Sequence, residues 1–501
     1  MAGSEVRRYR FGPLEHRGVV GGLRAGQVAV VAGSLLGVVL LLQLSSTPGM
    51  VLLALLVGLG GAAAAFYPVF GRTVEQWAPI VCSWTAQRLL GRTHYQSGAP
   101  TAGVNRDGSS GETPVSPPEE LAGLDLLSAV LRGREVGVAA DRRAGTYTAV
   151  LAVRVRSFGL LDRAEQERRL AGWGGVLAGL ARENSPIGRL QWVERTVPSD
   201  GDELGRHLQQ ERDPSVALAS SAVSSYIELV ESAGAVTRDH ELFVALQLDA
   251  RRGWRQIKRL GKGDDAACAL LMRELEALAE RLVAAEVQVQ GALGPRMLAR
   301  VIRDAYDPYG RTHRNRLATN PDSEGDGVDP GSAWPLATDA SWGEYRTDSA
   351  WHATYWISQW PRIDVAASFL SPLLMQTSVL RSVAVCMEPV APSTALRKIE
   401  AARTTDIADE VTRRRTGFIT TARKRSAQEA TARREQELAD GHAELRFAGF
   451  VTVSARDEQG LERACAEVEH AAGLARLELQ RLYGQQPTAF TYTLPLGRGL
   501  A

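Results

Sequence analysis

The sequence predicts an α+β protein in which an N-terminal two-helix transmembrane hairpin precedes a large cytoplasmic region of helices covering mostly antiparallel sheets. Two observations lead to this prediction. Two uncharged apolar runs lie near the N-terminus, and strand-like and helix-like segments alternate along the rest of the 501 residues. The net charge is +1, so no global electrostatic field recruits nucleic acid.

The predicted spanning helices cover residues 26–44 and 49–70, and neither contains a charged residue. At about 1.5 Å of rise per residue, each run is long enough to cross about 30 Å of hydrocarbon. Only residues 45–48 separate them, which predicts a helical hairpin. The alternative is a pair of buried core helices, which is disfavoured because neither run keeps an amphipathic period.

The charges around the hairpin predict its orientation. Arginines flank it on both sides, at Arg7, Arg8, Arg10, Arg17, Arg24, Arg72, Arg88 and Arg92. The positive-inside rule therefore predicts a multi-pass protein of the inner (cytoplasmic) membrane with both termini in the cytoplasm. Tyr67, Trp77 and Trp84 are expected at the inner interface, where amphipathic rings are favoured. A cleaved signal peptide is disfavoured because a second apolar run follows at once.

Composition divides the chain into five segments. We expect a membrane anchor over residues 1–95, a flexible linker over 96–120, a first α+β domain over 121–314, a polar loop over 315–343 and a second α+β region over 344–501. The linker is predicted because Gly, Ser, Pro and Thr cannot bury an apolar face. The four cysteines form no CxxC pair, so no zinc or redox motif is indicated.

Periodicity predicts the individual elements. The strand-like segments are 146–156, 188–196, 241–248, 353–360, 378–387, 443–455 and 489–493. The helix-like segments are 162–182 with Asp162 as N-cap, 214–231, 264–290 and 461–482. A charged helical stretch over 392–440 lacks an apolar heptad, so we expect a helical hairpin projecting into solvent. No tandem repeat of fixed period is visible.

Motifs for chemistry are weak, so we expect no enzyme and assign no catalytic, cofactor-binding or metal-ligating residue. The nearest approach to a phosphate-binding loop is 261–265 (GKGDD), whose acidic residues would repel phosphate. We expect a turn before a helix, capped by Asp264 or Asp265. Residues 322–327 partly mimic a calcium loop, but Ala333 stands where a bidentate Glu is required.

Three further features carry alternative interpretations. His240, His352 and His442 are scattered and are expected to be structural. The basic helical stretch over 397–434 is interleaved with carboxylates, which favours a solvated helix over a surface for a partner, lipid or DNA. The aromatic run from Trp334 to Trp360 favours sheet core over a docking surface, with the alternating Trp356 and Trp360 on one face.

The C-terminal segment resembles the end of the N-terminal domain of the TraC/TrbE/CagE class of conjugation ATPases in type IV secretion. The matching features are the VTVS strand at 451–454, the L-x-x-A-x-x-E-V helix at 461–468, Leu482-Tyr483, Phe490 and Leu494-Pro495. The class continues into an ATPase core with no counterpart in this sequence. The resemblance therefore implies a partner of such machinery and carries over no ATPase residue.

The anchor is similar to the PrgI/TcpE type of small inner-membrane subunit, through Tyr9-Arg10-Phe11-Gly12 and the hairpin. Together the parts resemble an actinobacterial membrane-protein family associated with conjugation-type gene clusters. The resemblance implies a non-catalytic inner-membrane component of a type IV-like conjugative or secretion apparatus that docks a separate ATPase or channel subunit. A type VII-like secretion scaffold and a membrane-tethered enzyme with an unrecognised site are the alternatives. Homo-oligomerisation, cargo and nucleic-acid contact stay open.

Overall fold

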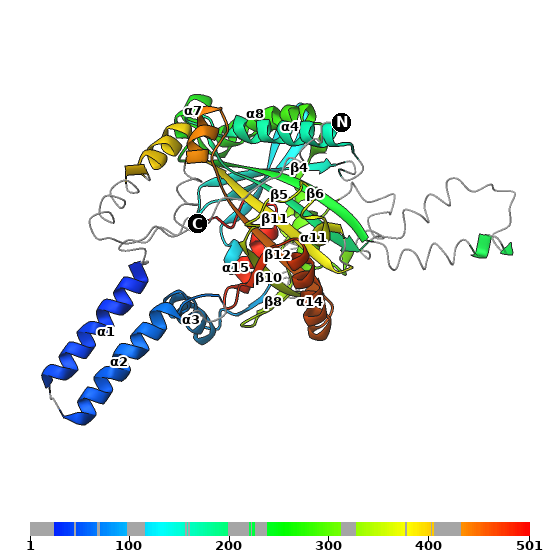
Figure 1. Cartoon of the computed structure of the whole chain (residues 1–501). Helices are drawn as coiled ribbons and strands as arrows, with labels where there is room; N and C mark the ends of the chain where they lie inside the picture. The colour runs from blue at the N-terminus through cyan, green and yellow to red at the C-terminus, as the bar shows by residue number, and fades with distance from the viewer. Residues whose placement is uncertain are drawn as a thin grey trace, which may run out of the picture.

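The computed structural model describes a chain with an apolar hairpin attached to an antiparallel sheet (Figure 1). The described residues are 25–44, 47–67, 71–97, 116–155, 158, 161–198, 220–221, 223–225, 238–311, 327–375, 378–401, 403–404 and 432–500.

The hairpin consists of α1 (Ala25–Leu44) and α2 (Pro48–Phe66). Both are long and apolar enough to cross a membrane, and most of their leucines are exposed. The two helices pack closely where Gly61 faces Ser34. The predicted helical hairpin is confirmed, although α2 ends at Phe66 rather than at residue 70.

A third helix, α3 (Val74–Leu89), follows the hairpin and was not predicted from the sequence. It begins with a reciprocal capping box between Thr73 and Gln76. The next strand, β1 (His94–Gln96), pairs with β8 (Ala337–Ala340) and so enters the main sheet. The chain segment assigned to the anchor thus contributes a strand to the body.

The thirteen strands of the sheet pair in antiparallel fashion in the order β1-β8-β9-β10-β12-β11-β5-β6-β4-β3-β2, with β13 on β10 and β7 on β4. The remaining bounds are β2 (Leu124–Leu131), β3 (Arg134–Asp141), β4 (Thr146–Arg154), β5 (Ile187–Pro198), β6 (Arg238–Asp249), β7 (Gln288–Ala292), β9 (Tyr345–Arg346), β10 (Trp351–Gln359), β11 (Leu380–Pro389), β12 (Leu445–Ala455) and β13 (Glu478–Arg481). The predicted α+β class with mostly antiparallel sheets is confirmed.

Two βαββαβ units make up the centre of this sheet. The first comprises β4, α4 (Arg163–Leu180), β5, β6, α8 (Gly263–Ala284) and β7, and the second comprises β10, α11 (Ser371–Met375), β11, β12, α14 (Glu458–Leu474) and β13. In both units the fourth strand pairs with the first, the first with the third and the third with the second, as in a ferredoxin-like fold. The units join through β5 and β11.

The same unusual turn recurs in both units, between the second helix and the last strand. Glu286 and Arg476 follow the helix C-caps with φ of 62° and 58°, a left-handed conformation that is uncommon for residues other than glycine. In each case the next backbone N–H, from Val287 or Leu477, bonds back to the last helical turn at 2.9 Å. The turn lets each helix reverse directly into a strand.

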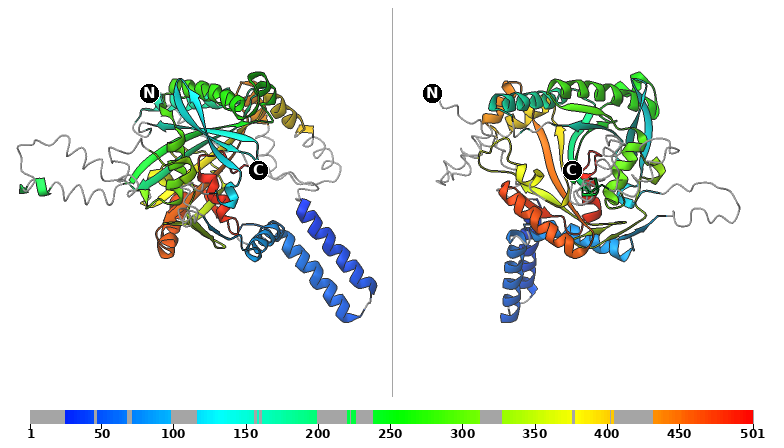
Figure 2. Two further views of the ribbon diagram at one scale, coloured as in Figure 1. Left: turned by 180° about the vertical axis from the view of Figure 1, so that it is seen from behind. Right: turned by 90° about the vertical axis from the view of Figure 1, so that its right-hand side faces the viewer.

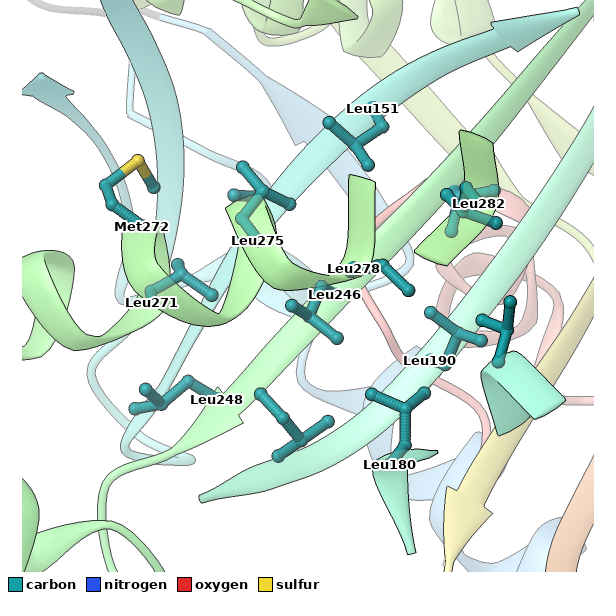
Figure 3. Packing of buried hydrophobic residues seen from close by; sticks show 14 of the residues in the cluster. Leu151, Leu180, Leu190, Leu246, Leu248, Leu271, Met272, Leu275, Leu278 and Leu282 are labelled. Atoms are coloured by element: carbon teal, nitrogen blue, oxygen red, sulfur yellow. The ribbon is translucent and has the colours of Figure 1, made fainter. Parts of the chain in front are cut away.

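Helices cover one face of each unit. Figure 3 shows α8 laying Leu271, Leu275 and Leu278 over β4, β5 and β6, and α4 adds Leu180 to the same cluster. The helix α14 packs in the same way on β10, β11 and β12. The opposite face holds α9 (Pro295–Tyr306) and the C-terminal turns, which Figure 2 shows enclosed by the strands.

The C-terminal residues 486–500 cross this second face and are held by buried polar side chains. Gln191 of β5 donates to the Tyr492 carbonyl at 2.8 Å and accepts from the Gly497 N–H at 2.8 Å. Gln247 of β6 donates to the Leu496 carbonyl at 3.0 Å. The segment is therefore part of the core of both units. Its first residues form α15 (Gln486–Phe490) and a 3₁₀ turn, so the predicted strand over 489–493 is wrong.

Most other predicted elements are confirmed at β4, β5, β6, β10, β11 and β12, and at α4, where Asp162 accepts a bond from the Glu165 N–H. The predicted helices over 264–290 and 461–482 are too long, because their last residues form β7 and β13. The helix predicted over 214–231 lies almost wholly outside the described residues. So does the middle of the stretch over 392–440, whose described ends are helical and are joined by an Arg403–Glu435 ion pair at 2.7 Å.

Candidate functional site

The most distinctive site in the described part of the chain is the joint between the hairpin and the body. It is an aromatic cluster formed by Trp77 and Trp84 of α3, Trp342 of the β8–β9 turn and Tyr483 after β13. We call these four residues the anchor joint. Figure 1 shows α3 lying between the hairpin and the body.

Trp342 lies at the centre of the anchor joint. Its ring centre is 5.1 Å from that of Trp84 in an edge-to-face arrangement and 5.9 Å from that of Trp77. It also stacks on Tyr483 at 6.4 Å. Offset and edge-to-face pairs are the favourable geometries for aromatic rings, so these contacts hold α3 against the second unit.

A glycine permits this close packing. Gly484 has a φ of +69°, and a Cβ atom there would lie 2.6 Å from the Trp342 ring and 2.9 Å from Ile80 of α3. Its N–H donates to the Trp342 carbonyl at 2.6 Å. Glycine is required both for the left-handed backbone and for the approach of α3.

Arginines surround the rings of the anchor joint. Arg72 lies 5.5 Å from the centre of Trp77, and Arg88 lies 5.2 Å from that of Trp84. Arg481 lies 5.8 Å from the centre of Tyr483, and its Nε donates to the Gly343 carbonyl at 2.8 Å. These are cation–π distances. Trp77 and Trp84, which we expected at the inner membrane interface, thus also contact the body.

A cavity of about 220 Å³ lies beside the strand that follows α3. Its lining includes Arg92, Tyr95 and Glu120, together with Tyr345 from β9. Burial raises the pKa of Glu120 and that of Tyr345. Within this lining, Arg92 pairs with Glu119 at 3.2 Å.

The predicted turn at 261–265 does precede a helix, α8, but neither aspartate caps it, because Lys262 occupies the N-cap position without a capping bond. Asp264 instead receives two hydrogen bonds from Arg142, at 2.5 and 2.7 Å, and one from the Tyr147 hydroxyl at 2.8 Å. These contacts lower the pKa of Asp264, Arg142 most of all. The carboxylate thus fastens α8 to the sheet. Residues 322–326 lie outside the described part of the chain.

The three histidines have separate surroundings. His240 of β6 contacts Glu194 of the neighbouring strand β5 at 2.6 Å, and His442 lies 3.2 Å from the Glu437 carbonyl. His352 is fully buried between Thr347 and Ser454, each at 2.8 Å, and burial lowers its pKa to about 3. The ring of His352 is therefore neutral at physiological pH.

The aromatic run divides between core and joint. Trp334 and Tyr355 are buried, whereas Trp342 forms the anchor joint. The prediction that Trp356 and Trp360 share a face is wrong, because the pairing of β10 with β13 shifts register between Ile357 and Gln359 and the strand ends there. The two rings consequently pack in different clusters.

Other ionisable groups of the body are ion-paired or buried. Burial would raise the pKa of Glu241, but Arg195 at 2.6 Å and Arg311 at 2.7 Å lower it to about 2. Burial raises the pKa of the thiols of Cys268, Cys386 and Cys465 to about 11, 12 and 11. Such thiols carry little thiolate at neutral pH.

Among the described residues, no group of three or more His, Cys, Asp or Glu side chains is placed to hold a metal ion.

Comparison with known proteins gives no relative for this chain: no protein family matches it, and no curated protein matches it.

Proposed function

We propose that this chain is a non-catalytic membrane-anchored component of a type IV-like conjugative or secretion apparatus, which docks a separate ATPase or channel subunit. The observation that supports the proposal best is the anchor joint. It couples an apolar hairpin to a continuous sheet of two βαββαβ units, an arrangement suited to holding a protein-binding body at a membrane. The resemblance of residues 451–495 to conjugation ATPase N-terminal domains supplies the type of apparatus.

The residues that carry this resemblance lie mostly inside the fold. The VTVS segment lies in the C-terminal half of β12, where residues 451–453 are buried, and the helix at 461–468 is part of the α14 face that packs on the sheet. Phe490 and Leu494 are core residues. All of these residues build the second unit, so partner recognition would fall to the exposed surfaces of that scaffold.

The test is co-purification of the full chain, tagged at its C-terminus, from detergent-solubilised native membranes. Quantitative mass spectrometry should recover a secretion ATPase or channel subunit well above an untagged strain. Recovery of the chain without any such subunit would reject the proposal. Enrichment of type VII components instead would support that alternative scaffold.

The proposed location is the inner membrane, with the body and both termini in the cytoplasm. Cys82 is the exposed cysteine of α3, next to the hairpin. A membrane-impermeant maleimide should leave Cys82 unlabelled in intact cells and label it in inverted vesicles. A Cys82→Ser variant controls for reaction elsewhere. Labelling of Cys82 in intact cells would place the body outside and overturn the proposed orientation.

A further inference from the structure

The connection between β6 and α8 forms a basic surface that neither the fold nor the proposed function explains. It contains the short helix α7 (Trp254–Leu260). In Figure 1, α7 lies at the top of the body, whereas α1 and α2 extend below it on the same flank. We call residues 251–262 the α7 surface.

The α7 surface concentrates positive charge. Its exposed cations without an ion-pair partner in the described part of the chain are Arg251, Arg255, Lys258, Arg259 and Lys262. No carboxylate occurs between Asp249 and Asp264. Arg255, Lys258 and Arg259 stand at i, i+3 and i+4 and so share one helical face. Arg252 differs, since it pairs with Glu388.

Two large apolar side chains accompany these cations. Trp254 is 54% exposed and Leu260 is 50% exposed, at the two ends of α7. The Arg255 guanidinium lies 5.4 Å from the Trp254 ring centre, which is a cation–π contact. Ile257, between them, packs against the core cluster of the first unit and fixes the helix in place.

A cavity of about 300 Å³ adjoins α7. Its lining includes Arg259 of α7, Arg182 after α4 and Arg273 of α8, together with Glu183 and Glu274. Arg182 and Arg273 are paired with Glu274, at 2.8 and 3.3 Å, so Arg259 is the cation left to face the cavity. The basic surface thus continues into a depression that a side chain of a partner can enter.

We infer that the α7 surface docks an acidic amphipathic segment of a partner protein. Tryptophan and arginine dominate interface hot spots, and complementary charge steers association. The apolar face of such a segment would cover Trp254 and Leu260, and its carboxylates would meet the cations between them. The inference goes beyond the proposed function because it names the surface and the chemistry of the partner segment.

Two other polyanions fit the surface less well. A nucleic acid needs a track of cations, but carboxylates bound this patch at Asp249, Asp265 and Glu388, and the whole chain carries only +1. An anionic membrane would have to reach the top of the body, whereas α1 and α2 extend below it. A short acidic segment matches a patch of this length.

The decisive experiment is site-specific photo-crosslinking in native membranes. Benzoylphenylalanine replaces Leu260 in the full chain, and Leu474, which is 58% exposed on α14, is the matched control position. Mass spectrometry then identifies the cross-linked peptide. We expect position 260, and not 474, to capture a segment rich in Asp and Glu. No adduct, a lipid or nucleic-acid adduct, or the same peptides at both positions would overturn the inference.

A binding assay on the purified full chain in phosphatidylcholine nanodiscs, where lipid already surrounds the hairpin, separates the partner classes. The probes are a fluorescein-labelled amphipathic helix of Glu, Leu and Ala, a twenty-nucleotide oligo-dT, and phosphatidylglycerol vesicles. The double variant Lys258→Glu with Arg259→Glu should bind the peptide at least about tenfold more weakly than the unchanged chain. Arg463→Glu, which reverses the charge of an exposed side chain on α14, should change the affinity for the peptide less than twofold. Tighter binding of oligo-dT or vesicles than of the peptide would reject the inference, while leaving the proposed function to its own co-purification test.

Discussion

Replacement of Trp342 by alanine should detach α3 from the body without unfolding the sheet. Trp342 contacts Trp77, Trp84 and Tyr483 at centroid distances of 5.9, 5.1 and 6.4 Å. Truncation of a fully buried tryptophan costs about 3–5 kcal/mol, and Trp342 is half-buried, so we expect a loss of about 2 kcal/mol. This loss should reduce the free energy of docking of α3 on the body, because these rings join α3 to the second unit.

The consequence is measurable as local opening. An isolated helix of 16 residues is only marginally stable in water, so undocked α3 should exchange its amide hydrogens freely. A docking loss of about 2 kcal/mol corresponds to about thirtyfold faster exchange. Hydrogen–deuterium exchange of the full chain in detergent, read from peptides covering α3 and α8, tests this. The exchange of α8 should stay unchanged.

Trp360→Ala provides the matched control. Trp360 also packs edge-to-face on an aromatic ring, that of Phe447 at 5.2 Å, but it lies away from α3. The Trp360→Ala variant should have a lower global stability, and the rate of amide hydrogen exchange in α3 should stay unchanged. Unchanged α3 exchange in Trp342→Ala, or equal acceleration in Trp360→Ala, would refute the role of the anchor joint.

Three further predictions concern the body. Gln191→Leu leaves the Tyr492 carbonyl and the Gly497 N–H without their buried partner. The free energy of unfolding, measured by urea titration, should therefore fall by about 2–4 kcal/mol. The control Gln459→Leu, at an exposed position, should change it very little. The pKa of Glu241 is lowered to about 2, so the stability it contributes is present above its unfolded pKa and is lost as the pH falls towards 2. Glu241→Gln should flatten that part of the pH–stability curve, and an unchanged curve would contradict the ion-pair assignment. Glu286→Gly and Arg476→Gly should each stabilise by about 0.5–1 kcal/mol in thermal denaturation because both residues have positive φ, whereas Ala285→Gly should destabilise.

Strands with an alternating or β-rich pattern could be predicted from the sequence. Strands that follow a turn with no recognisable sequence signal, such as β3, β7 and β13, could not. The first hairpin, β2 and β3, turns at Arg132 and Gly133 with φ of 49° and 78°. This is the geometry of a type I′ turn, but an Arg–Gly pair lacks the Asn–Gly or Asp–Gly signal that marks such turns. The apolar run in β2 could equally have been a helix.

The fourth strand of each unit was missed for one shared reason. The position after the C-cap of α8 and of α14 holds no glycine, since Glu286 and Arg476 adopt the left-handed conformation there themselves. Sequence reasoning therefore extended both helices through β7 and β13. Without these two strands neither unit is complete, and the repeated βαββαβ order could not be seen.

The anchor joint escaped prediction because it is assembled from three distant parts of the chain. Trp77 and Trp84 were visible as interfacial aromatics, and Trp342 as part of an aromatic run. Only Gly484, which follows Tyr483 and carries a positive φ, marks the place where a helix approaches. A glycine of this kind shows that something lies close, and the fold shows that it is α3.

The repeat places the two candidate functional surfaces on different units of one sheet. The anchor joint lies on the second unit, beside β13, and the α7 surface belongs to the first unit, between β6 and α8. The two units are joined by the β5–β11 ladder, and the C-terminal segment bonds to both of them through Gln191 and Thr452. A partner docked at α7, as proposed, would be connected to α3 through the sheet and the anchor joint. If the hairpin spans the membrane as proposed, this connection would set the orientation of the docked protein relative to the membrane as well as its distance.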